Sequence, residues 1–256
     1  MADLTRSELD RLGDRLKAAG EAASDRAAYN MFRASFGPSL SAVIEASANV
    51  VRQRLHQAAR FKTLESTAAK LRRGSSRLSQ IQDIAGLRFV VKGTAEQGEA
   101  VASLIAAFPN CRVTDYRKAP QNGYRAVHII TPQELGRRVE IQLRTDVENV
   151  WANTSELAAA VAGMDVKYGG GPAPIRASLD RLSQLVAAID GGRAAAQAAL
   201  QQMHAAATAM TGGGDPTSLQ RDASMAVDDW EASSAAMQSE AAELLRMLRG
   251  MIGSAT

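Results

Sequence analysis

Basic and hydroxyl side chains recur at regular intervals in the segment RFKTLESTAAK, residues 60–70. Lys62, Ser66 and Lys70 are spaced by four, so on a helix they form one slowly drifting stripe. Two ammonium groups and a hydroxyl on one face suit a polyphosphate. Arg60 would lie one turn earlier on such a helix, and its flat guanidinium can stack on a base. A solvated lysine face is the alternative interpretation.

The hexapeptide DIAGLR, residues 83–88, places an aspartate at the start of an apolar run. Mg²⁺ commonly takes one or two carboxylates together with substrate phosphates, so Asp83 is a candidate ligand. Simple alternation puts Asp83 and Arg88 on opposite faces of a strand. Both reach one site only if Asp83 precedes the regular strand or Gly86 marks a bulge. A turn aspartate before a core strand is the alternative.

Apolar and polar residues alternate strictly in VEIQLRT, residues 139–145. This pattern predicts a strand that buries its three aliphatic side chains and exposes the three polar ones between them, Glu140, Gln142 and Arg144. Such a face offers a carboxylate base with orienting partners. An ordinary half-exposed strand has the same pattern.

The stretch APQNGYRAVHII, residues 119–130, begins as a turn and continues as a strand. Residues 121–123 favour the turn. Tyr124 and His128 then share one face of the expected strand, with Arg125 on the other. A tyrosine ring can stack on a base, and His128 would reach the same ligand. A lone histidine in a strand is, however, more often structural.

These segments require a sheet to position them. Residues 1 to about 73 and those from about 175 onwards have helical spacing. The block between them predicts strand, helix, strand, strand, strand, helix, over residues 83–93, 94–108, 111–118, 124–131, 137–145 and 146–163. We therefore expect an α+β fold, a mixed sheet with helices on one face and a polar face left for function.

Composition narrows the class of protein. The chain has 256 residues, is 46% hydrophobic and carries a net charge of +3. Residues 51–92 contain ten basic and two acidic side chains, a local field that attracts phosphates, although a solvated basic face is the alternative. Cys111 is the only cysteine, and no apolar run reaches the roughly 18 residues of a membrane span. We expect a soluble cytoplasmic protein.

The order of the four motifs resembles the synthetase domain of the RelA/SpoT family. The residues that carry the resemblance read R-x-K-x3-S-x3-K, D-I-A-G-L-R, D-Y-x-K followed by N-G-Y-R-x-x-H, and V-E-I-Q-L-R-T, spanning 60 to about 157. The resemblance implies a nucleotidyltransferase-like fold. It also implies transfer of pyrophosphate from ATP to the 3′-hydroxyl of a guanine nucleotide (GDP or GTP), giving (p)ppGpp and AMP.

The same resemblance implies roles for individual residues on the donor side. ATP would be bound by Arg60 and Arg88 around its adenine and by Lys62, Ser66 and Lys70 on its phosphates. Asp83 would bind Mg²⁺. Glu140 would act as a metal partner or as the general base for the 3′-hydroxyl, supported by Gln142 and Arg144.

On the acceptor side, Tyr124 would stack on the guanine and His128 would lie near the acceptor's phosphate, with Arg125 and Lys118 as further contacts. The loop here departs from the family pattern, because Pro120 and Gln121 stand where free-nucleotide synthetases tend to carry a lysine close before N-G-Y. Two alternatives therefore stay open within the fold, a toxin-like enzyme that modifies the 3′-CCA end of tRNA and one that makes an adenine alarmone. An inactive nucleotide- or RNA-binding module is a third.

We expect three regions: an N-terminal helical region (1–58), the synthetase core (59–172) and a C-terminal helical region (173–256). The segment TGGGDP at 211–216 would interrupt the last of these. The terminal helices are candidates for packing on the core, for a homo-oligomer interface or for antitoxin binding.

Overall fold

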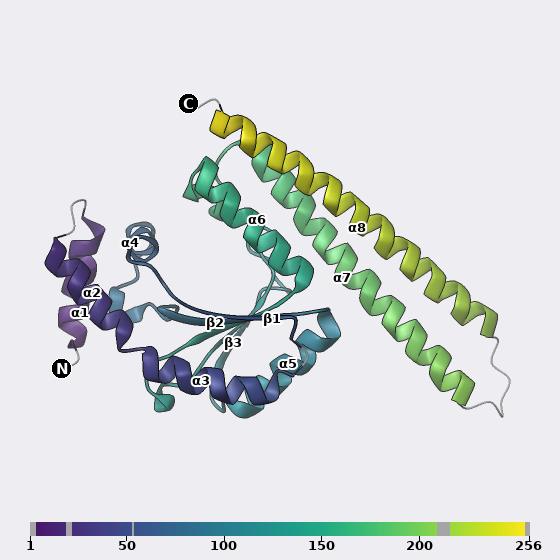
Figure 1. Cartoon of the computed structure of the whole chain (residues 1–256), viewed down its shortest axis with the longest axis horizontal. Helices are drawn as coiled ribbons and strands as arrows, with labels where there is room; N and C mark the ends of the chain where they lie inside the picture. The colour runs from purple at the N-terminus through teal and green to yellow at the C-terminus, as the bar shows by residue number, and fades with distance from the viewer. Residues whose placement is uncertain (1–3, 19–21, 53, 209–215, 254–256) are drawn as a thin grey trace. The chain divides into compact units, whose positions relative to one another are not determined.

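A five-stranded sheet organises the fold in the computed structural model, which describes residues 4–18, 22–52, 54–208 and 216–253 (Figure 1). The strand order is β1-β2-β5-β4-β3, and the β1–β2 and β4–β5 pairs are antiparallel. The strands are β1 (His56–Phe61), β2 (Ala85–Val91), β3 (Arg112–Asp115), β4 (Val127–Ile130) and β5 (Glu140–Thr145). The sheet is mixed and flanked by helices, which confirms the predicted α+β, nucleotidyltransferase-like class.

The described residues divide into two compact units. The first contains residues 1–90, 99–114 and 127–143, and the second contains 91–98, 115–126 and 144–256. The units are defined by packing, and each is made of three separate segments of the chain. The boundaries that we expect from the sequence, after residues 58 and 172, remain a prediction.

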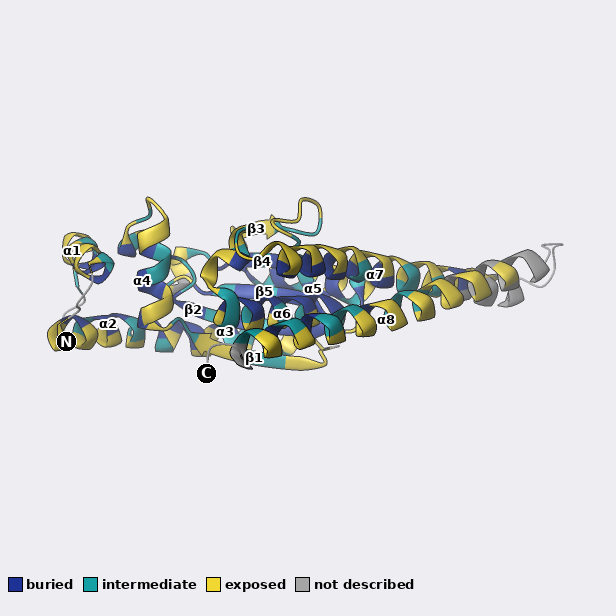
Figure 2. Cartoon of the chain, turned by 90° about the horizontal axis from the view of Figure 1, so that it is seen from above, coloured by how far each residue is buried: buried dark blue, intermediate teal, exposed yellow. Residues whose placement is uncertain are grey.

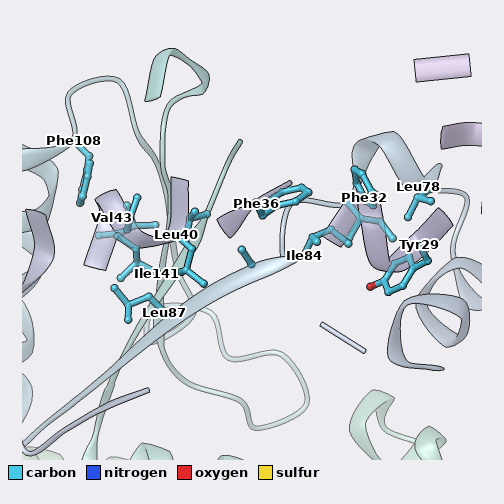
Figure 3. Close-up of a cluster of buried hydrophobic side chains, with 14 of the residues drawn as sticks. Tyr29, Phe32, Phe36, Leu40, Val43, Leu78, Ile84, Leu87, Phe108 and Ile141 are labelled. Atoms are coloured by element: carbon cyan, nitrogen blue, oxygen red, sulfur yellow. The ribbon is translucent and has the colours of Figure 1, made fainter. Parts of the chain in front are cut away.

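In the first unit, helices pack around the sheet. They are α1 (Arg6–Lys17), α2 (Ala23–Ala34), α3 (Gly37–Val50), α4 (Leu64–Arg73) and α5 (Thr94–Ala107), with a 3-10 turn, η1 (Leu78–Gln80). Figure 1 shows α3 and α5 on one side of the sheet and α4 on the other. Figure 3 shows how the core forms, with Val43 of α3 lying near Leu87 of β2 and Ile141 of β5. Burial of each such aliphatic side chain stabilises the folded state by about 1.5–3 kcal/mol. The opposite face of β2 and β5 carries the polar residues.

The second unit is built on three helices, α6 (Asp146–Ala162), α7 (Ala173–Thr208) and α8 (Pro216–Gly253). A separate apolar cluster joins them, including Trp151, Leu182 and Leu244. Figure 2 shows exposed residues along both paired helices, α7 and α8, with buried residues visible on α7 and mostly intermediate ones between the exposed residues of α8. The short turn η3 (Met164–Tyr168) also belongs to this unit, whereas η2 (Gln133–Leu135) belongs to the first. The predicted glycine break lies at residues outside those described, and α8 begins directly after it.

The structure corrects the predicted helix over residues 60–70. Residues 56–61 form strand β1, in which Arg60 lies opposite Gly86 of β2, and α4 begins only at Leu64. The segment HQAARF has little intrinsic preference for a strand, so its pairing with β2 decides its conformation. Thr63 caps α4 by accepting a hydrogen bond from the N–H of Ser66 at 3.1 Å.

Two smaller expectations about the strands are also wrong. Tyr124 precedes β4 instead of lying in it, because the turn extends to that residue: Asn122 and Gly123 have positive φ angles of 50° and 85°, and the Tyr124 N–H donates to the Gln121 carbonyl at 3.0 Å. Arg144 is buried, not exposed. The remaining pattern of β5 is confirmed, with its aliphatic residues fully buried.

No helix among the residues that the structure covers is long and apolar enough to cross a membrane.

Candidate active site

Two lysines converge on one carboxylate in the first unit. Lys62 Nζ lies 2.9 Å from Asp83 Oδ2, and Lys70 Nζ lies 2.9 Å from Asp83 Oδ1. Burial raises the pKa of Asp83, but the two ammonium groups outweigh it and hold that pKa below its usual range. Asp83 is therefore an ionised carboxylate between two cations at neutral pH. It lies just before β2, the first of the two arrangements that the sequence allows.

The three elements around Asp83 explain this convergence. Lys62 follows β1, whereas Lys70 lies on α4 one turn after Ser66. Ser66 is exposed at the N-terminal turn of α4, where Thr63 Oγ1 donates to its hydroxyl at 3.0 Å. The positive end of the helix dipole lies at this turn, so anions are favoured there. The lysines and the serine thus occupy a turn and a helix start that suit phosphate oxygens.

A small cavity of about 90 Å³ lies beside this cluster. The register of β1 and β2 places Arg60 and Arg88 on one face of the sheet, each opposite a small residue, Gly86 and Ala58 respectively. The two arginines line the cavity together with Asp83, Gly86, Leu87, Ala58, Glu140 and Gln142. Small residues between two guanidinium groups leave room for a flat ring, and arginine planes stack on such rings.

Glu140 is held by two neighbours on the polar face. His128 Nδ1 lies 2.9 Å from Glu140 Oε1, and Gln142 Nε2 donates to Glu140 Oε2 at 2.7 Å. Burial raises the pKa of Glu140, but its interactions with His128 outweigh burial and lower that pKa overall. The pairing of His128 with Gln142 across β4 and β5 creates this geometry. His128, assigned from the sequence to the acceptor side, therefore contacts the candidate base or metal ligand.

The donor set fits a magnesium ion brought by a substrate. Asp83 and Glu140 line the same cavity. The described residues, this site included, contain no group of three or more His, Cys, Asp or Glu side chains that could hold a metal by themselves. Mg²⁺ takes one or two carboxylates and completes its shell with phosphates and water. Both oxygens of Asp83 contact ammonium groups, so a cation there would compete with Lys62 and Lys70.

In the second unit, an aromatic and cationic cluster surrounds Tyr124. The Tyr124 ring lies 5.6 Å from that of Tyr116 and 6.2 Å from that of Trp151, between ring centroids. Arg144 Nη2 donates to the Tyr124 hydroxyl at 3.0 Å, and its guanidinium carbon lies 5.2 Å from the ring centroid. The ring that we expect to stack on the acceptor base is therefore held by defined contacts.

Arg125 and Lys118, the other two residues predicted for the acceptor side beside Tyr124, lie in different environments. Arg125 Nη1 donates to the Ser183 carbonyl of α7 at 3.0 Å and also contacts the Ser183 hydroxyl. Lys118 is exposed. Its neighbour Arg117 forms an ion pair with Asp115 at 2.8 Å. Arg125 is thus directed at α7, which no feature of the sequence indicates.

Sequence reasoning missed two residues that hold the site. Tyr29 of α2 donates to the carbonyl of Lys62 at 2.9 Å, and Trp151 Nε1 donates to the carbonyl of Leu179 at 2.8 Å. A single tryptophan in an alanine-rich helix, within the WANTSE segment, is the one local signal that could have found Trp151. Nothing in the local pattern separates Tyr29 from an ordinary core residue.

Comparison with known proteins matches residues 59–161 to the family described as "Region found in RelA / SpoT proteins". Uncharacterised proteins of Mycobacterium tuberculosis and Mycobacterium bovis are 36% identical to this chain over 124 residues, which is 47% of this chain. The match covers 45% of each relative, so the chain spans just under half of their length.

Solved structures share the fold. Small alarmone synthetase 1 from Bacillus subtilis is 25% identical, with a TM-score of 0.52, over 65% of this chain and 96% of that one. The same enzyme bound to its product pppGpp gives a TM-score of 0.53 at 23% identity, over 67% and 99% of the two chains. Small alarmone synthetase 2 from the same organism gives 0.52 at 23%, over 62% and 93%.

Proposed function

We propose that residues 59–161, which match the region found in RelA/SpoT proteins, form a synthetase domain of that family and that the chain transfers the β,γ-pyrophosphate of ATP to the 3′-hydroxyl of a guanine nucleotide. The observation that supports this most directly is the convergence of Lys62 and Lys70 on Asp83 at 2.9 Å each, beside a cavity lined by two arginines. Such transfer depends on positioning and charge neutralisation, which these groups can supply.

In this proposal the donor residues lie in the first unit. Arg60 and Arg88 hold the adenine between them over the floor made by Ala58 and Gly86. The phosphates of ATP are bound by Lys62, Ser66 and Lys70. The two lysine ammonium groups then contact phosphate oxygens in place of the Asp83 carboxylate. Asp83 would hold Mg²⁺, which when bound would neutralise charge on the phosphates, and Glu140 is either its partner on the metal or the general base.

The acceptor residues are proposed to be those around Tyr124, whose ring stacks on the acceptor's base. The 3′-oxygen of the acceptor bonds to the β-phosphorus of ATP, and the bond from that phosphorus to the oxygen shared with the α-phosphate breaks. AMP is the leaving group. The hydroxyl proton passes to a base, for which Glu140 is the candidate if it does not hold the metal.

A second candidate acceptor is the 3′ end of tRNA, and the lack of a basic residue directly before the turn at Asn122–Gly123 supports it. Pro120, Gln121 and Asn122 precede Gly123, so the charge available before the turn is that of the exposed Lys118. An adenine nucleotide acceptor is tested in the same way.

The test is incubation with γ-labelled ATP and, separately, GDP, GTP, an adenine nucleotide or total tRNA. We expect label in GDP or GTP with one AMP released per transfer. Label only in tRNA or in the adenine nucleotide would replace the proposed acceptor, and ATP binding with no label in any acceptor would leave an inactive binding module.

A matched pair of variants tests Glu140. Loss of an electrostatic group from a site typically lowers kcat by about 10²–10³-fold, and we expect this of Glu140→Gln. Glu134→Gln, an exposed carboxamide substitution in the same unit, should retain activity. Full activity of Glu140→Gln would remove Glu140 from the mechanism.

A further inference from the structure

Helix α7 contacts the turn that carries Tyr124 through a serine. Ser183 Oγ donates to the carbonyl of Gly123 at 2.8 Å, and Ser183 is buried. Arg125, on the other side of Tyr124, donates back to the Ser183 carbonyl at 3.0 Å. The residues immediately before and after Tyr124 are therefore both bound to one position of α7.

The turn is packed too closely against α7 and α6 for any other residue at position 123. Gly123 has a φ of +85°, and a Cβ atom there would lie 2.9 Å from Trp151 Cζ2 and 3.0 Å from Ser183 Cβ. Both the positive φ and the close approach require glycine. The backbone of the turn thus rests directly on Ser183 and Trp151.

The same face of α7 also fixes the ring that packs on Tyr124. Trp151 Nε1 donates to the carbonyl of Leu179 at 2.8 Å. Leu179 and Ser183 are four residues apart, so they lie one above the other on one face of the helix. One face of α7 therefore holds both the turn before Tyr124 and its aromatic neighbour.

We propose that Ser183 is a positioning residue for the acceptor. Helix α7 then holds Tyr124 in place to bind the acceptor's base. The proposal rests on the proposed function only in identifying Tyr124 as the residue that stacks on the acceptor's base. Helix α7 begins after residue 161, where the RelA/SpoT match ends. Acceptor binding in this chain therefore depends on a segment that the family match does not include.

The test compares Ser183→Ala with Ser178→Ala. Ser178 is a buried serine of the same helix that bonds to Arg181 (Nη2 to Oγ, 3.2 Å) instead of the turn. Both variants lose a buried hydroxyl, so they share any general loss of stability. The loss of one hydrogen bond corresponds to a change of roughly threefold to tenfold. We expect Ser183→Ala to raise KM for the acceptor by that factor with KM for ATP unchanged, and Ser178→Ala to change neither.

A second measurement does not depend on activity. We expect amide hydrogen exchange in residues 119–126 to accelerate in Ser183→Ala and in Trp151→Phe, but not in Ser178→Ala. Accelerated exchange without transfer activity in the wild-type chain would overturn the proposed function and leave the positioning role standing. Unchanged exchange, or an unchanged acceptor KM in an active enzyme, would overturn the role of Ser183 and leave the proposed function intact.

Discussion

The Tyr29 hydroxyl on α2 donates a hydrogen bond to the backbone carbonyl of Lys62 at 2.9 Å. The same hydroxyl lies 2.7 Å from Thr67 Oγ1 on α4, and Tyr29 is fully buried. Figure 3 shows the ring among the core side chains, with its oxygen at the edge of the cluster. Helix α2 is thereby hydrogen-bonded to the junction between β1 and α4. Lys62 lies at this junction, and its side chain contacts Asp83.

Tyr29→Phe should weaken this junction. The substitution leaves the ring in place but deprives buried Thr67 and the half-buried Lys62 carbonyl of a hydrogen-bond partner, which costs about 1–3 kcal/mol of unfolding free energy. We expect KM for ATP to rise with that for the acceptor unchanged, because Lys62 is proposed to bind the donor. Denaturant unfolding and steady-state kinetics measure the two effects. Tyr168→Phe, at an exposed tyrosine of the second unit, should alter neither. Equal effects on both substrates would assign Tyr29 to general stability.

Gly86 offers a test of the proposed adenine cavity. A Cβ atom at this position would lie 3.7 Å from the Glu140 carbonyl oxygen and 4.0 Å from that of Arg60, which is ordinary contact distance. Gly86→Val should therefore fold, and β-branched residues are favoured in strands. The new side chain would enter the cavity between Arg60 and Arg88, so we expect ATP binding to fall at least tenfold.

The control for this change is Gly98→Ala on α5, where an added Cβ meets nothing within 4 Å. It should keep both its stability and its affinity for ATP. Normal ATP affinity in a folded Gly86→Val variant, measured by calorimetric titration, would show that adenine binds elsewhere.

Part of this site was predictable because short-range patterns determine it. The alternation in residues 139–145 correctly placed Glu140 and Gln142 beside each other on a polar face. The Asn122–Gly123 turn follows from the preference of these residues for positive φ. Alternation left two arrangements for Asp83, a position before the strand or a bulge at Gly86, and the structure has the first, because β2 begins at Ala85. Each of these conclusions needs only neighbours in sequence.

What escaped prediction depends on partners far away in the chain. Residues 56–61 form a strand because they pair with β2, and Arg144 is buried because it bonds to Tyr124, 20 residues earlier. Ser183 has no distinguishing sequence feature, since its role comes from its packing against Gly123, 60 residues away. Single-sequence patterns carry no information on such pairings.

Asp190 of α7 predicts a pH dependence of stability. It is buried and accepts a hydrogen bond from Thr145 Oγ1 at 2.9 Å. Burial, reinforced by the nearby carboxylates Glu148 and Asp146 and opposed by Thr145 and Arg193, raises the pKa of Asp190 to about 7. A raised pKa means that the folded state binds the proton more tightly than the unfolded state. This contribution is complete below about pH 4 and is lost as the pH rises through about 7.

Asp190→Asn should therefore reduce the loss of stability between pH 5.5 and 8.5, since asparagine remains neutral and can still accept from Thr145. The difference between wild type and variant should amount to a few kcal/mol, from about 1.4 kcal/mol per pKa unit. Urea unfolding at a series of pH values measures it. Asp180→Asn, an exposed carboxylate of the same helix, controls for the loss of a charge. Parallel pH profiles for wild type and Asp190→Asn would contradict the raised pKa.

Gln121→Lys tests the effect of the lysine that the acceptor loop lacks before Asn122. Gln121 is exposed, and its backbone carbonyl accepts from Tyr124, so its side chain can change without breaking the turn. If Tyr124 stacks on the base of a free guanine nucleotide, a lysine just before the turn adds a cation for the 5′-phosphates. An exposed ion pair contributes about 0.2–1 kcal/mol, so KM for GDP or GTP should fall roughly twofold to fivefold, and less at high salt.

Gln202→Lys adds the same charge to an exposed position of α7 and should leave these constants unchanged. The comparison also separates the two acceptor classes. A protein that uses tRNA would gain affinity for tRNA from either lysine, since counterion release depends on charge more than on position. A protein that uses a free nucleotide responds only to the lysine at position 121. Equal responses to both variants would therefore favour a nucleic-acid acceptor, and no response to Gln121→Lys would place the 5′-phosphates away from this turn.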